Sequence, residues 1–114
     1  MSARPILALV LPSLALGTGL ASCRPATPRR YVVEMKDLAF TPAEVTVSPG
    51  DTIIWVDHDL FPHTATGDSG SGWEVGPLQP GGEGSYVPTK AGAYAYRCRL
   101  HPTMHGTIIA RSQR

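Results

Sequence analysis

Four side chains that bind copper well form a short pattern in the second half of the chain. Cys98, His101 and Met104 follow one another at Cys-x2-His-x2-Met spacing, and His63 precedes them in a separate segment. Thiolate and thioether sulfur suit Cu(I), whereas imidazole suits both Cu(I) and Cu(II). A trigonal Cys-His-His set with a weak axial Met therefore suits an ion that changes oxidation state. The pattern predicts one copper ion that accepts and donates a single electron.

The same residues fit other sites less well. Structural zinc sites usually contain paired Cys-x2-4-Cys ligands, which this sequence lacks. The chain has no His-Glu-x-x-His motif, and a set of four protein ligands leaves no open position for a substrate, so we do not expect an enzyme. Taken singly, Cys98 or Met104 would be read as a core residue and His63 as a loop histidine; together they favour a metal site. The other histidines, His58 and His105, are expected at the surface.

The segments around these ligands are typical of short β-strands. Eleven prolines and twelve glycines interrupt the chain, and the apolar stretches between them are rich in Val, Ile, Thr and Tyr. Seven short strands in about 80 residues predict an all-β fold, an antiparallel sandwich. The predicted strands cover residues 31–35, 44–47, 52–57, 63–66, 84–88, 93–98 and 107–110.

Side-chain alternation along the strand at residues 93–98 places the cysteine. Tyr94, Tyr96 and Cys98 share one face of this strand, which we predict to face the interior. Cys98 then lies where the strand gives way to a loop that carries His101 and Met104. His63 must arrive from the end of a different strand. We expect Gly106 to let the chain turn sharply into its last strand, and Trp55 and Trp73 to be packing residues.

Residues 31–110 resemble the cupredoxins, the plastocyanin and amicyanin group of small blue-copper proteins. The short Cys-x2-His-Pro-x-Met loop is most similar to that of amicyanin. The resemblance implies a Greek-key β-sandwich that carries one electron at a time between larger redox proteins, such as a cytochrome c, a membrane oxidase or a dehydrogenase. The segments that carry it are residues 40–47, 50–56, 62–64, 80–82 and 94–107.

The resemblance also implies a role for each ligand. It implies that His63 and His101 are the imidazole ligands, Cys98 the thiolate ligand and Met104 the axial thioether. Two positions depart from the family pattern. Thr64 stands where many members have an Asn that bridges the ligand loops, so the hydrogen bonds around the site should be looser or rewired. Arg97 replaces an exposed aromatic residue of plastocyanins, so we expect electrons to leave through the exposed edge of His101.

The N-terminus is typical of a secretory signal. One positive charge at Arg4 precedes an apolar run over residues 5–20, which is too short and too interrupted for a membrane span of about 20 apolar residues. Leu20-Ala21-Ser22-Cys23 resembles the lipobox of bacterial lipoproteins. We therefore predict a signal peptide over residues 1–22, a lipid on the Cys23 thiol and export to the cell envelope, anchored to a membrane. An ordinary signal that leaves a free Cys23 is the alternative.

The prediction for the N-terminus also bears on the second cysteine. A Cys23–Cys98 disulfide is the obvious pairing in an exported chain, but Cys23 would lie in a mobile segment where a bridge constrains little. If Cys23 is acylated, Cys98 is left alone and metal binding explains it. Residues 23–30 are polar and proline-rich, which predicts an extended tether. The copper-binding domain is then residues 31–114.

The charge balance of the chain excludes one class of partner. Removing residues 1–22 leaves nine basic and nine acidic residues, with no basic stripe to bind nucleic acid. We expect a monomer whose partners are redox proteins. The sequence leaves two other functions open. The same ligands could belong to a copper carrier that binds Cu(I) for delivery to an oxidase, or to a metal-free sandwich that acts through its surfaces.

Overall fold

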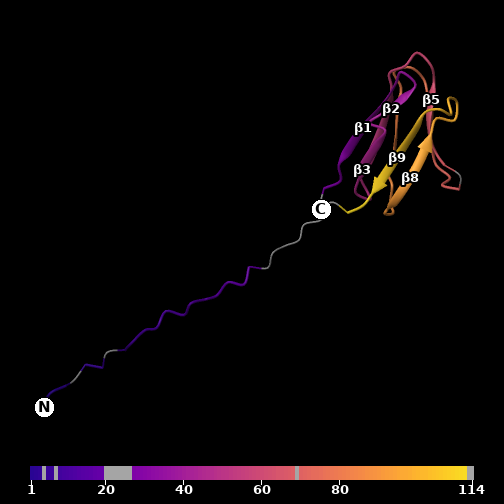
Figure 1. Ribbon diagram of the computed structural model, residues 1–114. Helices are drawn as coiled ribbons and strands as arrows, with labels where there is room; N and C mark the ends of the chain where they lie inside the picture. The colour runs from indigo at the N-terminus through magenta and orange to yellow at the C-terminus, as the bar shows by residue number, and fades with distance from the viewer. Residues whose placement is uncertain (4, 7, 20–26, 69, 113–114) are drawn as a thin grey trace.

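The computed structural model describes residues 1–3, 5–6, 8–19, 27–68 and 70–112, and in these residues all regular structure is β-strand (Figure 1). Because short segments rich in Val, Ile, Thr and Tyr alternate with Pro and Gly, strands are expected throughout. The strands are β1 (Arg30–Lys36), β2 (Ala39–Thr41), β3 (Glu44–Val47), β4 (Thr52–Asp57), β5 (His63–Gly67), β6 (Glu74–Leu78), β7 (Glu83–Tyr86), β8 (Gly92–Arg97) and β9 (His105–Ala110).

The strands form two sheets that enclose a common core. One sheet has the strand order β2-β1-β4-β7 and the other the order β3-β9-β8-β5-β6. Most neighbouring strands are antiparallel, but β1 pairs with β4 and β3 pairs with β9 in parallel. The structure confirms the predicted all-β sandwich. It adds the two parallel pairs, which join strands that are distant in the sequence.

All seven predicted strands are present, with ends that differ by two residues at most. The sequence did not predict β2 and β6. β2 has three residues, too few to show an alternating pattern. β6 contains Gly76 and Pro77, two residue types that are rare inside strands, and Pro77 is tolerated because β6 lies at the edge of its sheet.

The core lies between the sheets and is rich in aromatic side chains. Trp55 and Tyr96 are fully buried at its centre, with ring centroids 5.5 Å apart in an edge-to-face arrangement. The Trp55 Nε1–H donates a hydrogen bond to the Tyr96 hydroxyl at 3.3 Å. Trp73 is only partly buried and stacks on Tyr86. The expectation that both tryptophans are packing residues is confirmed.

Gly106 has a different role from the one expected. It lies inside β9, directly opposite Tyr96 on β8, and its φ is not in the positive range. A Cβ atom at this position would overlap the ring of Tyr96. Gly106 is therefore required because the tyrosine ring covers the backbone of the neighbouring strand, and it does not serve to turn the chain.

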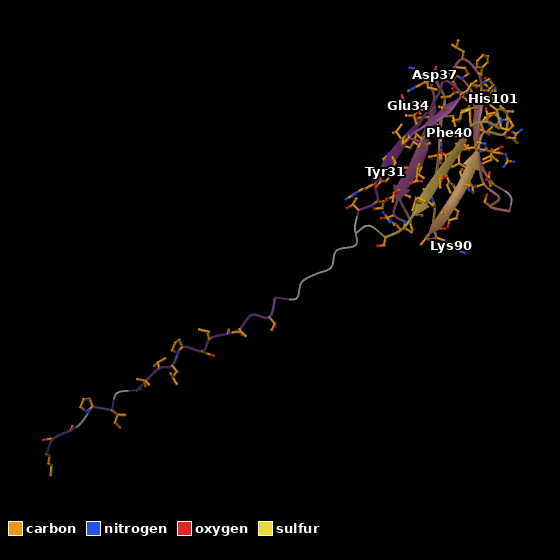
Figure 2. All side chains as sticks on the ribbon, viewed as in Figure 1. Tyr31, Glu34, Asp37, Phe40, Lys90 and His101 are labelled. Carbon is orange, nitrogen blue, oxygen red and sulfur yellow. The ribbon has the colours of Figure 1, made fainter. Side chains whose placement is uncertain are left out.

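The two ends of the sandwich differ in what they carry. His101 lies at one end and Lys90 at the other, and β1 begins at the Lys90 end (Figure 2). The described residues before position 20 lead away from the sandwich, and apolar side chains such as Val10 and Leu14 are exposed there. Among the described residues, no helix is long and apolar enough to cross a membrane. Cys23, the predicted lipid attachment point, lies outside the described residues.

Candidate metal centre

Three of the four predicted ligands converge at the His101 end of the sandwich. The Sγ of Cys98 lies 3.8 Å from the Nδ1 of His63 and 3.8 Å from the Nδ1 of His101. The two Nδ1 atoms are 3.1 Å apart. Cys98 and His63 are fully buried and His101 is half-buried. Side chains from two separate segments thus direct three metal-binding atoms at one point.

Strand ends hold these side chains in place. His63 is the first residue of β5, and Cys98 directly follows β8. The loop after β8 is closed by two backbone hydrogen bonds, from the N–H of Cys98 to the carbonyl of Met104 at 3.1 Å and from the N–H of Met104 to the carbonyl of His101 at 3.0 Å. Because both segments are anchored in the same sheet, the separation of the ligand atoms is set by the fold.

The spacing of the three atoms fits a single metal ion. First-row ions such as zinc bind imidazole nitrogen at about 2.0–2.1 Å and thiolate sulfur at about 2.3 Å. One ion can then contact a nitrogen and a sulfur up to about 4.4 Å apart, and two nitrogens up to about 4.2 Å apart. All three separations fall below these limits. The residues present therefore fit one ion, which Cys98 would hold through sulfur and His63 and His101 through nitrogen.

Met104 is also at this end of the sandwich. It is fully buried and forms part of the same core as Cys98. It is the last residue before β9 and shares the loop with the other two C-terminal ligand candidates. The hydrogen bond from the backbone N–H of Cys98 to the carbonyl of Met104 holds the two residues close together.

A carboxylate that the sequence analysis did not identify orients His63. The Nε2 of His63 lies 2.7 Å from the Oδ2 of Asp59. Nε2 therefore carries the proton that is donated to the carboxylate, and Nδ1 presents its lone pair to the site. Such carboxylate–histidine pairs are common around metal ions because they fix the tautomer and the ring orientation of the ligand. The signal that could have identified Asp59 is the preference of metal-bound histidines for a carboxylate partner, because acidic residues lie shortly before His63 in the sequence.

Asp59 is itself fixed by backbone groups. The N–H groups of Asp37 and Leu38, in the turn between β1 and β2, donate to its two carboxylate oxygens at 2.7 and 3.0 Å. Burial raises the pKa of Asp59, but these donors and His63 outweigh it and place the pKa below its usual value. Asp59 thus stays ionised at neutral pH and keeps its hold on the His63 ring.

The sulfur of Cys98 is prepared to act as a thiolate. The backbone N–H of Thr64 donates to Sγ at 3.3 Å. Burial raises the pKa of the thiol, yet the hydrogen bond from the Thr64 N–H and the polar contacts of Sγ with the His63 and His101 imidazoles outweigh burial and lower the pKa to about 7. A substantial fraction of Cys98 is therefore deprotonated near neutral pH, as a metal ligand requires.

The other histidines and the two arginines that flank Cys98 in the sequence lie outside the group of converging side chains. His58 is exposed and lies 2.8 Å from Glu34, and His105 is exposed at the start of β9. Neither belongs to the metal-compatible group found among the described residues, as expected. Arg97 pairs with Asp68 at 3.0 Å, and Arg99 pairs with Glu74 at 2.8 Å.

Comparison with known proteins agrees with this geometry. Residues 6–110 match the family of the Cupredoxin-like domain. The chain is 30% identical over 82 residues to an amicyanin of Paracoccus denitrificans, a match that covers 68% of this chain and 63% of the relative, so the chain spans less than two thirds of that protein. It is 31% identical over 125 residues to a plastocyanin of Synechococcus sp., a match that covers 90% of each.

Solved structures support the same fold. A reduced amicyanin variant is 26% identical and aligns with a TM-score of 0.66 over 72% of this chain and 82% of its own. A copper-containing nitrite reductase of Thermus scotoductus aligns with a TM-score of 0.69 over 83% of this chain but only 25% of its own; at 24% identity, this shows the fold alone. The sandwich topology, the convergent His-Cys-His group and the family match lead to one conclusion: this chain belongs to the cupredoxin family.

Proposed function

We propose that this protein binds one copper ion and carries single electrons between redox proteins of the cell envelope. His63 and His101 would bind the ion through Nδ1, Cys98 through its thiolate and Met104 as a weak axial thioether. The observation that carries the proposal is the convergence of the three candidate ligand atoms at separations of 3.1–3.8 Å. When bound, copper supplies the change between Cu(II) and Cu(I).

The protein contributes a site that is rigid and nearly closed. Cys98, His63 and Met104 are buried, and the hydrogen bonds of Asp59 and Thr64 hold the first two in place. Four protein ligands leave no position for a substrate, so the site suits electron transfer and not catalysis. A ligand set that is already in place has little to rearrange when an electron arrives or leaves, which favours fast transfer.

His101 is the proposed route for electrons. It is the most exposed of the three convergent ligands, and apolar side chains surround its end of the sandwich. Phe61 lies with its ring centroid 6.3 Å from that of His101, and Leu60, Phe61 and Leu100 are 87%, 55% and 41% exposed. An exposed apolar surface of this kind favours transient contact with a partner such as a cytochrome c, a membrane oxidase or a dehydrogenase.

We propose further that the chain is exported and held at a membrane by a lipid on Cys23. The apolar segment before residue 20 and the start of β1 at the end opposite His101 support this arrangement. A domain tethered through β1 would present His101 away from the membrane. Labelling cells with a radioactive fatty acid tests the anchor. Wild type should be labelled and Cys23→Ser unlabelled, and label that persists in Cys23→Ser would contradict lipid attachment at this residue.

Redox cycling tests the electron-carrier proposal. The copper-loaded protein should lose its visible thiolate-to-copper absorption when ascorbate reduces it and regain the absorption when ferricyanide oxidises it, through many cycles and with one copper per chain. A Cu(I) chelator added to the reduced protein should remove copper slowly. Rapid loss of copper on reduction would instead indicate a carrier that delivers Cu(I).

Met104→Leu should keep the visible absorption and raise the reduction potential. The thiolate of Cys98, which gives rise to the absorption, is unchanged. Loss of the axial thioether removes an electron donor, and leucine makes the site more apolar, so Cu(II) loses more stabilisation than Cu(I). A redox titration followed at the visible band measures the shift. A potential equal to that of wild type would exclude Met104 as the axial ligand.

A further inference from the structure

The hydroxyl group of Thr64 joins the two segments that carry the ligands. Its Oγ1 accepts a hydrogen bond from the backbone N–H of Arg99 at 2.8 Å and lies 2.8 Å from the Oγ1 of Thr66. Thr64 belongs to β5, whereas Arg99 follows Cys98 in the loop after β8. Thr64 thus bridges the two ligand-carrying segments, at the position where many members of the family have a bridging asparagine.

The hydrogen bonds continue from Thr66 to a surface ion pair. The Thr66 hydroxyl donates to the Oε1 of Glu74 at 2.7 Å, and the Nε of Arg99 donates to the same oxygen at 2.8 Å. Thr66 and Glu74 lie directly opposite each other on β5 and β6. The bonds from Arg99 and Thr66 hold the pKa of Glu74 below its usual value, so the carboxylate is ionised and can only accept.

The direction of each hydrogen bond between Thr64, Thr66 and Glu74 follows from the number of hydrogens that the two hydroxyl groups can donate. A hydroxyl has a single hydrogen to donate. Thr66 gives its hydrogen to the Glu74 carboxylate, because hydrogen bonds to ionised groups are the stronger ones. The Thr66 oxygen then receives the hydrogen of Thr64, at 2.8 Å, in preference to the Cys98 sulfur at 4.0 Å. Glu74 and Thr66 therefore turn the Thr64 hydroxyl away from the sulfur.

We propose that Thr66 is a positioning residue for the metal centre, because its oxygen holds the Thr64 hydrogen away from the Cys98 sulfur and so keeps the reduction potential low. This inference rests on the proposed copper site. Hydrogen bonding around the cysteine sulfur tunes the potential of such sites. A further donor withdraws electron density from the thiolate, which weakens its support of Cu(II). Without the Thr66 oxygen, the Thr64 hydroxyl is free to become that donor.

Substitution of Thr66 in the full chain tests the inference. In the copper-loaded Thr66→Val protein, the Thr64 hydroxyl loses its acceptor and turns to the sulfur. The reduction potential should rise, and the thiolate-to-copper band should move to higher energy, because electron density on the sulfur falls. Thr66→Ser is the matched control: it keeps the hydroxyl and should restore the wild-type potential and band. Thr66→Ala carries the same expectation as Thr66→Val and replaces it if valine is not tolerated.

A second substitution separates this mechanism from a general disturbance of the site. In a Thr64→Ala background there is no hydroxyl to turn, so adding Thr66→Val should leave the potential of that background unchanged. An unchanged or lowered potential in Thr66→Val, or an equal rise in both backgrounds, would overturn the inference while the blue colour still confirmed the copper site. Folded wild type without a visible band would instead reject the proposed function itself.

Discussion

Cys98→Ser should remove the intense visible absorption of the copper-loaded protein completely. The absorption arises from charge transfer between a thiolate and Cu(II), and a serine hydroxyl neither ionises near neutral pH nor offers a soft donor. The fold should persist, because the change is small and isosteric within a buried position. An absorption spectrum of the purified variant after addition of Cu(II), with circular dichroism to confirm folding, measures the effect.

Cys23→Ser is the matched control for this prediction. The chain has two cysteines, and the one within the described residues, Cys98, lies beside the two imidazole nitrogens. The Cys23 variant should therefore keep the full absorption with the same stoichiometry of one copper per chain. Equal loss of colour in the two variants would show that the thiolate ligand is not Cys98 alone.

Gly106→Ala should destabilise the domain strongly. The added methyl group would overlap the buried ring of Tyr96, which packs against Trp55 and cannot move without disturbing the core. Overpacking of this kind costs about 1–3 kcal/mol of unfolding free energy, and the position next to β8 favours the upper part of that range. Urea unfolding of the copper-free protein measures the loss directly, without a contribution from bound metal.

The role of the Tyr96 ring can be isolated in a second background. Tyr96→Leu removes the ring atoms that the new methyl group would meet, so Gly106→Ala should cost much less free energy there than in wild type. The difference between the two costs measures the clash itself. The same cost in both backgrounds would mean that Gly106 is needed for its backbone freedom, as the sequence first suggested, and not for the space that it leaves.

The sequence predicted the three side chains that converge better than it predicted the residues around them. The types and spacing of Cys98, His101 and His63 indicated a shared site because few functions combine them. Alternation along the strand correctly placed Tyr96 and Cys98 in the interior, whereas Tyr94, predicted to share that face, is only partly buried. The structure confirms that these three side chains converge. The role of Met104 as an axial ligand and the lipid on Cys23 stay predictions.

What the sequence missed depends on contacts between distant segments. Asp59 lies four residues before His63, but the sequence does not show that the β1–β2 turn holds its carboxylate against the His63 ring. The departure at Thr64 was visible in the sequence, but its consequence was not. The hydrogen bonds that Thr64 makes in place of an asparagine depend on the pairing of β5 with β6. The sequence did not predict β6 as a strand because this segment contains Gly and Pro.

Titration of the copper-free full chain with Cu(II), followed by visible absorption, tests the central claim most directly. The three donor atoms already lie within reach of one ion. We therefore predict an intense thiolate-to-copper band that grows linearly and stops at one copper per chain. A folded protein that stays colourless, or that binds copper without this band, would contradict the assignment of a blue-copper site to this chain.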